Sequence, residues 1–182
     1  MANESISSLK VTPNFTTYES SLAEQKLRNM IEQAEILGVE TSDVEATNNQ
    51  IIDIVRENNP ERLYLVESRL VKEGLSLGLL PRVVLLDRLL GLDAIIEVAD
   101  DKFGIDVTTG KDTVRYNKGE KANELKPSYE RLGIDHVVVL GMRNEDLSGD
   151  SISDDSIMSF FSHLEGVTAF KGQSPFVLNL KY

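Results

Sequence analysis

The fold is decided by the stretch Leu92–Thr109, which reads LDAIIEVADDKFGIDVTT. Two short apolar runs in it, Asp93–Val98 and Phe103–Thr109, predict strands, and the four residues between them suit a hairpin. Each run contains one aspartate, Asp93 or Asp106, and burying a carboxylate in a strand costs free energy. Two such carboxylates on adjacent strands therefore indicate a cation between them.

The chain after this hairpin predicts a crossover to a parallel strand. A polar helix is expected over Asn117–Arg131, and Gly133 ends it. The apolar run within Ile134–Met142 is typical of a strand that is covered on both faces. A short helix at Ile157–Leu164 and an edge strand at Phe176–Leu180 are expected to follow. A hairpin, a helix and a buried strand in this order imply a mixed α/β sheet flanked by helices.

The chain before the hairpin is expected to be helical. Met1–Ser20 is rich in Ser, Thr and Asn and predicts a loose arm. Apolar residues at helical spacing predict helices over Ser21–Leu37, Ser42–Glu57, Pro60–Leu75 and Leu79–Leu90. The last of these contains an apolar run, Val83–Leu86, that would equally suit a strand. We expect an N-terminal arm and helical extension at 1–59 and an α/β core at 60–182, or one domain throughout.

Composition limits the classes of function. The 182 residues carry a formal net charge of −11 and no cysteine, which excludes disulfides, thiolate metal sites and cysteine nucleophiles. Residues 1–60 carry 4 basic and 10 acidic side chains, whereas residues 111–131 carry 6 basic and 4 acidic ones. This basic stretch either faces nucleic acid or is a solvated helix face. With no signal peptide and no apolar run near the roughly 20 residues that span a bilayer, we expect a soluble, cytoplasmic protein without a membrane partner.

The order of elements resembles that of the PD-(D/E)XK nuclease superfamily, whose fold is called restriction-endonuclease-like. The resemblance covers Glu61–Met142. In that family an aspartate begins the second core strand, and an acidic-x-lysine triplet lies on the third. The sequence GLD ending at Asp93 matches the first position, and the triplet that starts at Asp106 matches except at its end, where Thr108 replaces the lysine.

The resemblance implies a magnesium site and an activity. Asp93 and Asp106 would hold Mg²⁺, which takes oxygen ligands, and Glu67 is the positional candidate for the acidic residue of the family's first helix, with Glu73 as its substitute. The implied activity is a Mg²⁺-dependent phosphodiesterase, a nuclease acting on DNA.

The missing motif lysine must be supplied from elsewhere if the protein is active, because Thr108 cannot carry a positive charge. Lys111, which follows the strand, is the candidate substitute, and Lys102 in the hairpin is a second one. The lysines expected to contact nucleic-acid phosphates are Lys118, Lys121 and Lys126.

The same residues also allow purely structural interpretations. Asp93 would serve equally to end a turn, and Asp106 would serve as a solvent-facing strand residue. His136 and His163 have no partners at metal-ligand spacing, and His136 is expected to be structural.

Two other functions remain open. A protein of the same fold without catalysis would bind nucleic acid or protein, with the helices before Pro60 facing another chain or a second copy of this one. An acidic protein that imitates nucleic acid would bind a basic partner.

Overall fold

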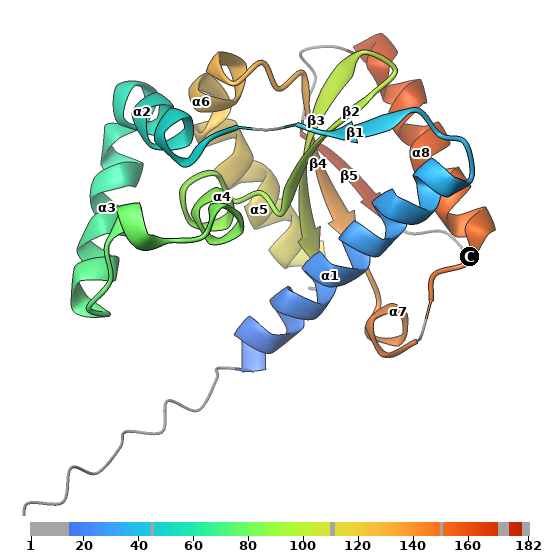
Figure 1. Ribbon diagram of the computed structural model, residues 1–182, viewed down its shortest axis with the longest axis horizontal. Coiled ribbons are helices and arrows are strands. Elements are labelled where there is room, and N and C mark those ends of the chain that lie inside the picture. The colour runs from blue at the N-terminus through green and yellow to red at the C-terminus, as the bar shows by residue number, and fades with distance from the viewer. Residues whose placement is uncertain (1–14, 45, 110–111, 150, 171–174, 180–182) are drawn as a thin grey trace, which may run out of the picture.

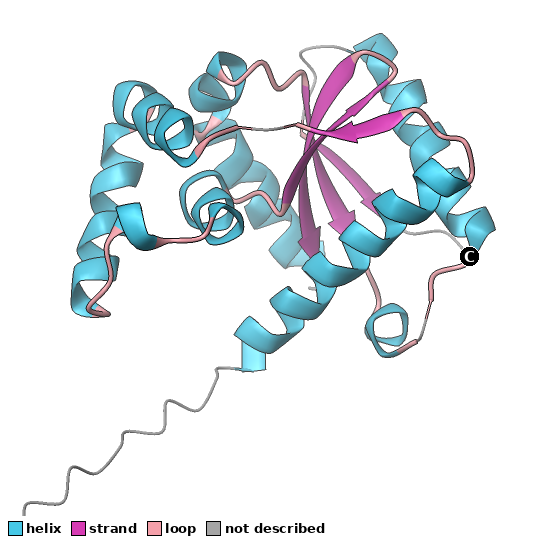
Figure 2. Ribbon diagram, viewed as in Figure 1, coloured by secondary structure: helices cyan, strands magenta, loops and turns pink. Residues whose placement is uncertain are grey.

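A mixed sheet of five strands, in the order β1-β2-β3-β4-β5, runs through the computed structural model (Figures 1 and 2). The strands are β1 (Thr41–Asp43), β2 (Ala94–Val98), β3 (Asp101–Thr108), β4 (His136–Gly141) and β5 (Phe176–Asn179). The pairs β1–β2 and β2–β3 are antiparallel, whereas β3–β4 and β4–β5 are parallel. The structure describes residues 15–44, 46–109, 112–149, 151–170 and 175–179.

Helices cover both faces of this sheet. The α-helices are α1 (Phe15–Ile36), α2 (Asn48–Asn58), α3 (Pro60–Lys72), α4 (Arg82–Leu90), α5 (Asp112–Glu124), α6 (Lys126–Arg131), α7 (Asn144–Ser148) and α8 (Asp154–Val167). Two short 3₁₀ helices, η1 (Leu77–Leu79) and η2 (Thr168–Phe170), follow α3 and α8. One apolar cluster joins α1 and α8 to the strands, and the other joins α2, α3, α4 and α6 to them. The predicted α/β class, a mixed sheet flanked by helices, is confirmed.

The alternation of side chains along β3 explains how one strand serves both clusters. Phe103, Ile105 and Val107 are buried in the cluster with α1 and α8. The residues between them point to the opposite face, because successive strand residues alternate. Asp106 is therefore directed toward the side on which α5 lies.

The crossover from β3 to β4 is parallel, as the sequence predicts. All six residues of β4 are buried, in keeping with a strand covered on both faces. The helical region between these strands is interrupted at Leu125, so that α5 and α6 replace the single predicted helix. Pro127 lies at the start of α6, where a backbone N–H would have no acceptor within the helix, so the missing N–H of proline removes no hydrogen bond. The predicted edge strand is confirmed at Phe176–Asn179.

The hairpin is tighter than the sequence suggests. Its turn consists of two residues, Ala99 and Asp100, and both have positive φ, 51° and 67°. Such a two-residue turn matches the twist of the flanking strands. Asp101 and Lys102, which we expected in the loop, therefore belong to β3.

The prediction of one helix over Ser42–Glu57 is wrong, because β1 pairs with β2 before α2 begins. Thr47 sets the start of α2: its hydroxyl accepts from the Gln50 N–H at 3.2 Å, and Gln50 Oε1 accepts from the Thr47 N–H at 2.9 Å. This reciprocal cap stabilises a helix start at Asn48.

Other element boundaries also differ from the prediction. Helix α1 begins at Phe15, inside the region expected to be a loose arm, and α7 lies within the acidic stretch after β4. Leu79–Leu90 contains a helix, α4, as we favoured. Apolar residues of α2 share one cluster with α3, α4 and α6, so helices from both sides of residue 59 pack together. The division of the chain at residue 59 remains a prediction.

Gly104 is required where β3 passes the fully buried Leu92. A Cβ at Gly104 would lie 2.8 Å from Leu92 Cδ1. We therefore expect Gly104→Ala to lower the free energy of unfolding by about 1–3 kcal/mol, as overpacking does. Gly78→Ala is the control, since nothing lies within 4 Å of its added Cβ. Urea denaturation checks both; equal midpoints for the two variants would contradict this packing.

Candidate functional site

The carboxylate of Asp93 lies against the peptide that joins Asp106 to Val107. The main chain reaches this position through Gly91, whose left-handed conformation (φ 65°) ends α4. The Asp93 N–H donates to the carbonyl of Ile105 at 2.7 Å. Asp93 Oδ2 in turn accepts from the Val107 N–H at 2.6 Å. The Asp93 side chain thus accepts a hydrogen bond from a backbone N–H of β3. This bond holds the carboxylate near Asp106.

Lys118 approaches Asp106 from α5. Its Nζ forms an ion pair with Asp106 Oδ1 and donates to the carbonyl of Val107 at 3.2 Å. The Asp106 side chain is 13% exposed, so water screens this pair only partly. Thr108, at the position of the family's motif lysine, is buried two residues along β3. A helix therefore supplies the ammonium that β3 lacks.

Burial dominates the electrostatics of the two carboxylates. It raises the pKa of Asp93 to about 7, the charge of Asp106 adds to this rise, and the Val107 N–H and Lys118 oppose it. Burial also raises the pKa of Asp106, while Lys118 opposes that rise. The site therefore carries more negative charge than its one paired lysine can balance.

A small cavity of about 60 Å³ adjoins Asp106 and Lys118. Asp87, Lys121 and Tyr129 also line it. The charge of Asp87, on α4, contributes to the raised pKa of Asp106 and of Asp93.

Tyr129 closes one side of this cavity. Its hydroxyl donates to the carbonyl of Leu90 at 2.6 Å, and burial raises its pKa. The tyrosine is therefore a neutral hydrogen-bond donor that secures the end of α4.

The other acidic and basic candidates lie apart from this cavity or outside the described residues. Glu67 is exposed on α3 and does not line the cavity with Asp106. Glu73 forms an ion pair with Arg88 at 2.9 Å. Lys102 lies near the opposite end of β3 from Asp106. Lys111 falls outside the described residues.

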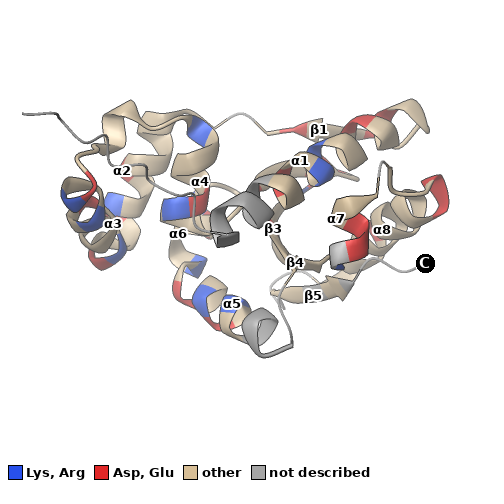
Figure 3. Cartoon of the chain, turned by 90° about the horizontal axis from the view of Figure 1, so that it is seen from below, with Lys and Arg blue, Asp and Glu red and all other residues tan. Residues whose placement is uncertain are grey.

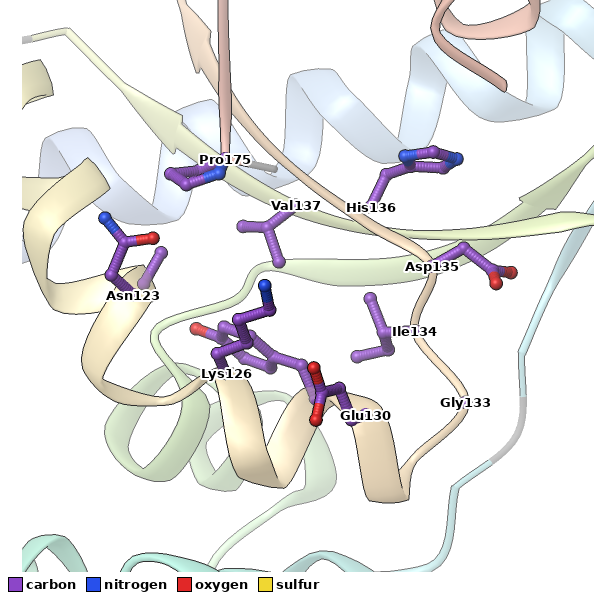
Figure 4. Close-up of a pocket in the computed structure, with 11 residues that line it drawn as sticks. Asn123, Lys126, Glu130, Gly133, Ile134, Asp135, His136, Val137 and Pro175 are labelled. Carbon is purple, nitrogen blue, oxygen red and sulfur yellow. The ribbon is translucent and has the colours of Figure 1, made fainter. Parts of the chain in front are cut away.

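Lys126 lines a separate cavity of about 270 Å³, shown in Figure 4. Asn123 and Glu130 lie near it there, and Pro175 lies across the cavity. The structure therefore brings Lys118 and Lys121 to the Asp106 cavity but places Lys126 at another one.

The two histidines have local roles. His136 is fully buried, its Nε2 lies 2.8 Å from Asp101 Oδ2, and its ring stacks on Phe103 with centroids 4.8 Å apart. Its ring points away from Lys126 and Glu130 in Figure 4. His163 is exposed and contacts the carbonyl of Ser159 at 2.6 Å through Nδ1.

Basic residues near the Asp106 cavity lie among acidic ones. Figure 3 shows Lys and Arg on α3 and α5 together with Asp and Glu on the same helices, and it shows Asp and Glu on α7 and α8. Lys118 and Lys121 are thus local positive charges on a chain whose formal net charge is −11.

Asp93 and Asp106 are the two residues that would hold a divalent cation such as Mg²⁺, but Asp93 lines an open cavity with Arg28, Glu32 and Arg82 and not the cavity that Asp106 lines. Within the described ranges, Asp93 Oδ1 and Asp106 Oδ2 have no hydrogen-bond donor, so each carboxylate keeps one oxygen for a ligand. No group of three or more His, Cys, Asp or Glu side chains in the described part of the chain is arranged to hold a metal. Two carboxylates are nevertheless a set that Mg²⁺ uses, because it retains several waters.

Sequence reasoning named Asp93 and Asp106 but missed Asp87 and assigned Lys118 only to phosphate. A signal for Asp87 exists, since α4 is the helix that directly precedes β2. The pairing of Lys118 with Asp106 has no signal in the sequence, because it depends on how α5 packs against β3.

Comparison of the chain with protein-family models, curated sequences and solved structures finds no match. Among the helices that the structure describes, none has both the length and the apolar character needed to cross a bilayer. The geometry and the chemistry of the site therefore carry the functional argument.

The raised pKa of Asp93 makes stability depend on pH. The folded protein binds this proton more tightly than the unfolded chain does, so stability falls as pH rises from about 4 to about 7. Asp93→Asn keeps an oxygen acceptor for the Val107 N–H and carries no charge. Without metal at pH 8, we expect the free energy of unfolding of Asp93→Asn to exceed that of the wild type by about 2 kcal/mol. This difference should become smaller as the pH is lowered toward 4. Urea titrations across pH test this; parallel profiles would contradict it.

Proposed function

We propose that this protein is a Mg²⁺-dependent phosphodiesterase that acts on DNA. The observation that carries the proposal is the convergence of Asp93 and Lys118 on two consecutive residues of β3, Asp106 and Val107. Two carboxylates with free oxygens and one ammonium are the groups that metal-assisted phosphoryl chemistry requires.

The strand order supports a restriction-endonuclease-like assignment. Asp93 directly precedes β2, the second strand of the sheet, and Asp106 lies on β3, the third. Helix α5 then follows, and β4 pairs in parallel with β3. This is the order of strands and acidic residues that the resemblance to the PD-(D/E)XK nuclease superfamily implies, and it supports the proposed assignment.

The position of Lys118 favours an active enzyme over an inactive relative of that fold. The lysine missing at Thr108 is replaced in space by an ammonium on α5 that reaches Asp106. Lys118 thus supplies the charge that Lys111 was expected to supply.

The residues of the chain have distinct roles in the proposed reaction. Asp93 Oδ1 and Asp106 Oδ2 would hold the metal ion, which when bound polarises the phosphodiester and lowers the pKa of a water ligand. Lys118 orients the attacking water and stabilises the charge on the phosphoryl oxygens. Water adds to phosphorus and loses a proton to solvent, one P–O ester bond breaks, and the leaving oxygen takes a proton from solvent.

Basic residues provide the contact with DNA phosphates. Lys121 lines the same cavity as Asp106 and Lys118, so it contacts the reacting phosphate or the next one. Lys126 lies outside this cavity and contacts phosphates farther along the strand. Because the contacts come from these few lysines on a chain with a net charge of −11, DNA binding should be weak at high salt.

Asp106→Asn should abolish Mg²⁺-dependent cleavage of DNA and leave the fold intact, because the variant removes one of the two anionic ligands. Gel assays with Mg²⁺ or Mn²⁺ measure cleavage, and titration calorimetry measures metal binding, which Asp93→Asn should also abolish. Glu67→Gln, on the exposed face of α3, is the matched acidic control and should retain activity. Absence of both metal binding and cleavage in the wild type at millimolar metal would refute the proposal and favour an interaction module.

Moving the lysine tests the assigned role of Lys118. Lys118→Ala should lower cleavage by about 10²-fold or more, the loss typical of one charge-stabilising donor. Thr108→Lys in the same protein should restore part of the activity, since it places the ammonium on β3 two residues after Asp106. Circular dichroism checks that both variants are folded. Full activity in Lys118→Ala would exclude this lysine from the reaction.

A further inference from the structure

Arg62 and Lys121 line one groove next to the candidate site, and neither forms an ion pair with an acidic side chain that the structure describes. Arg62 donates to the carbonyls of Arg88 and Leu89 at 2.5 and 3.4 Å, which leaves Nη1 without an acceptor among the described residues. Lys121 Nζ forms no ion pair or hydrogen bond with any described residue. Burial lowers the pKa of Lys121 and the charge of Arg62 lowers it further, whereas the charges of Asp87 and Asp106 oppose this shift. An anionic ligand between Arg62 and Lys121 would offset the repulsion between the two cations.

These two cations belong to an open groove of about 660 Å³ between α3 and α5. Its lining includes Asn58, Pro60, Leu65 and Leu125 as well as the two cations. Leu65 is 51% exposed, so the groove offers apolar surface to a ligand. The combination of apolar surface, amides and cations matches the base, the sugar and the phosphate of a nucleotide.

Hydrogen bonds between helices make this groove rigid. Asn59 Nδ2 donates to the carbonyl of Glu124 at 3.0 Å, and Asn59 Oδ1 accepts from the Ser128 hydroxyl at 2.6 Å. These bonds join the start of α3 to α5 and α6. A groove that is already formed spends little free energy on ordering when it binds a ligand.

The groove adjoins the candidate metal site because Lys121 lines both. Glu61 and Glu124 also line the groove, and their negative charges would repel a phosphate. The position between Arg62 and Lys121 is therefore the one that suits a phosphate. A strand with its reacting phosphate at Asp106 would therefore place its neighbouring nucleotide in the groove.

We infer that the groove between α3 and α5 binds one unpaired nucleotide next to the reacting phosphate, so that the substrate is a single strand or a single-stranded end of DNA. This inference rests on the proposed function. A paired nucleotide carries its complementary base with it, and a groove of this volume suits one drug-sized group rather than a duplex. Arg62 and Lys121 hold the phosphate, and Leu65 contacts the base or sugar.

Binding of labelled DNA in EDTA tests the inference without cleavage. A short single strand should bind at least about tenfold more tightly than a blunt duplex of the same length, as measured by fluorescence anisotropy. Lys121→Gln should weaken strand binding by about tenfold, the loss expected for one charge-assisted contact. Leu65→Ser should weaken it severalfold, and Lys72→Gln, an exposed lysine on the same helix as Arg62, should leave it unchanged. Lys121→Gln is expected to fold, because Lys121 Nζ forms no hydrogen bond or ion pair with the described residues that the substitution would remove.

The outcomes separate the two proposals. Equal binding of strand and duplex, unchanged strand binding in both Lys121→Gln and Leu65→Ser, or displacement by inorganic phosphate as effective as by unlabelled strand would overturn the groove assignment. Metal-dependent cleavage of blunt duplex with no preference for single strands would uphold the phosphodiesterase and overturn the groove. Selective strand binding that depends on Lys121, with no cleavage in any metal, would uphold the groove and overturn the phosphodiesterase.

Discussion

The hydrogen bond from the Val107 N–H to the Asp93 carboxylate is the contact on which the site depends. It fixes Asp93 beside Asp106 and places two acidic groups where burial raises the pKa of both. A fold that needed only stability would avoid such an arrangement, because desolvating a second carboxylate costs free energy that one lysine does not recover. Buried carboxylates with raised pKa values are frequent at functional sites, where a bound ligand can compensate their negative charge.

The helices around these carboxylates bring acidic and basic side chains to one region of the sheet. Helix α4 ends at Gly91, where the chain turns toward β2, and Asp93 directly precedes the first residue of that strand. Helix α5 crosses back from β3 to β4 and carries Lys118 and Lys121 over the same region. Helix α3 adds Arg62, whose bonds to the end of α4 connect it to the site. The helices before β2 thus supply one wall of the groove between α3 and α5 as well as part of the apolar core.

Local patterns were a good guide where one residue or a short run decides the structure. The strands β2 and β3, the buried run of β4 and the start of α3 at Pro60 all lie where the sequence indicates. The hairpin turn and β1 were misjudged because both depend on pairing with a neighbouring strand. Lys118 was recognised as a basic residue near the site, but its ion pair with Asp106 could not be foreseen.

By itself, the sequence determined the α/β class, the pairing of one aspartate at the start of β2 with one on β3, and the basic character of the segment after them. These properties follow from the polarity and periodicity of neighbouring residues, which act over a few positions of the chain. Only the tertiary structure decided which acidic and basic groups meet: Asp87 rather than Glu67 at the cavity, and Lys118 at Asp106. The reason is that contacts between residues from different elements depend on how helices pack on a sheet, and no local pattern encodes that distance.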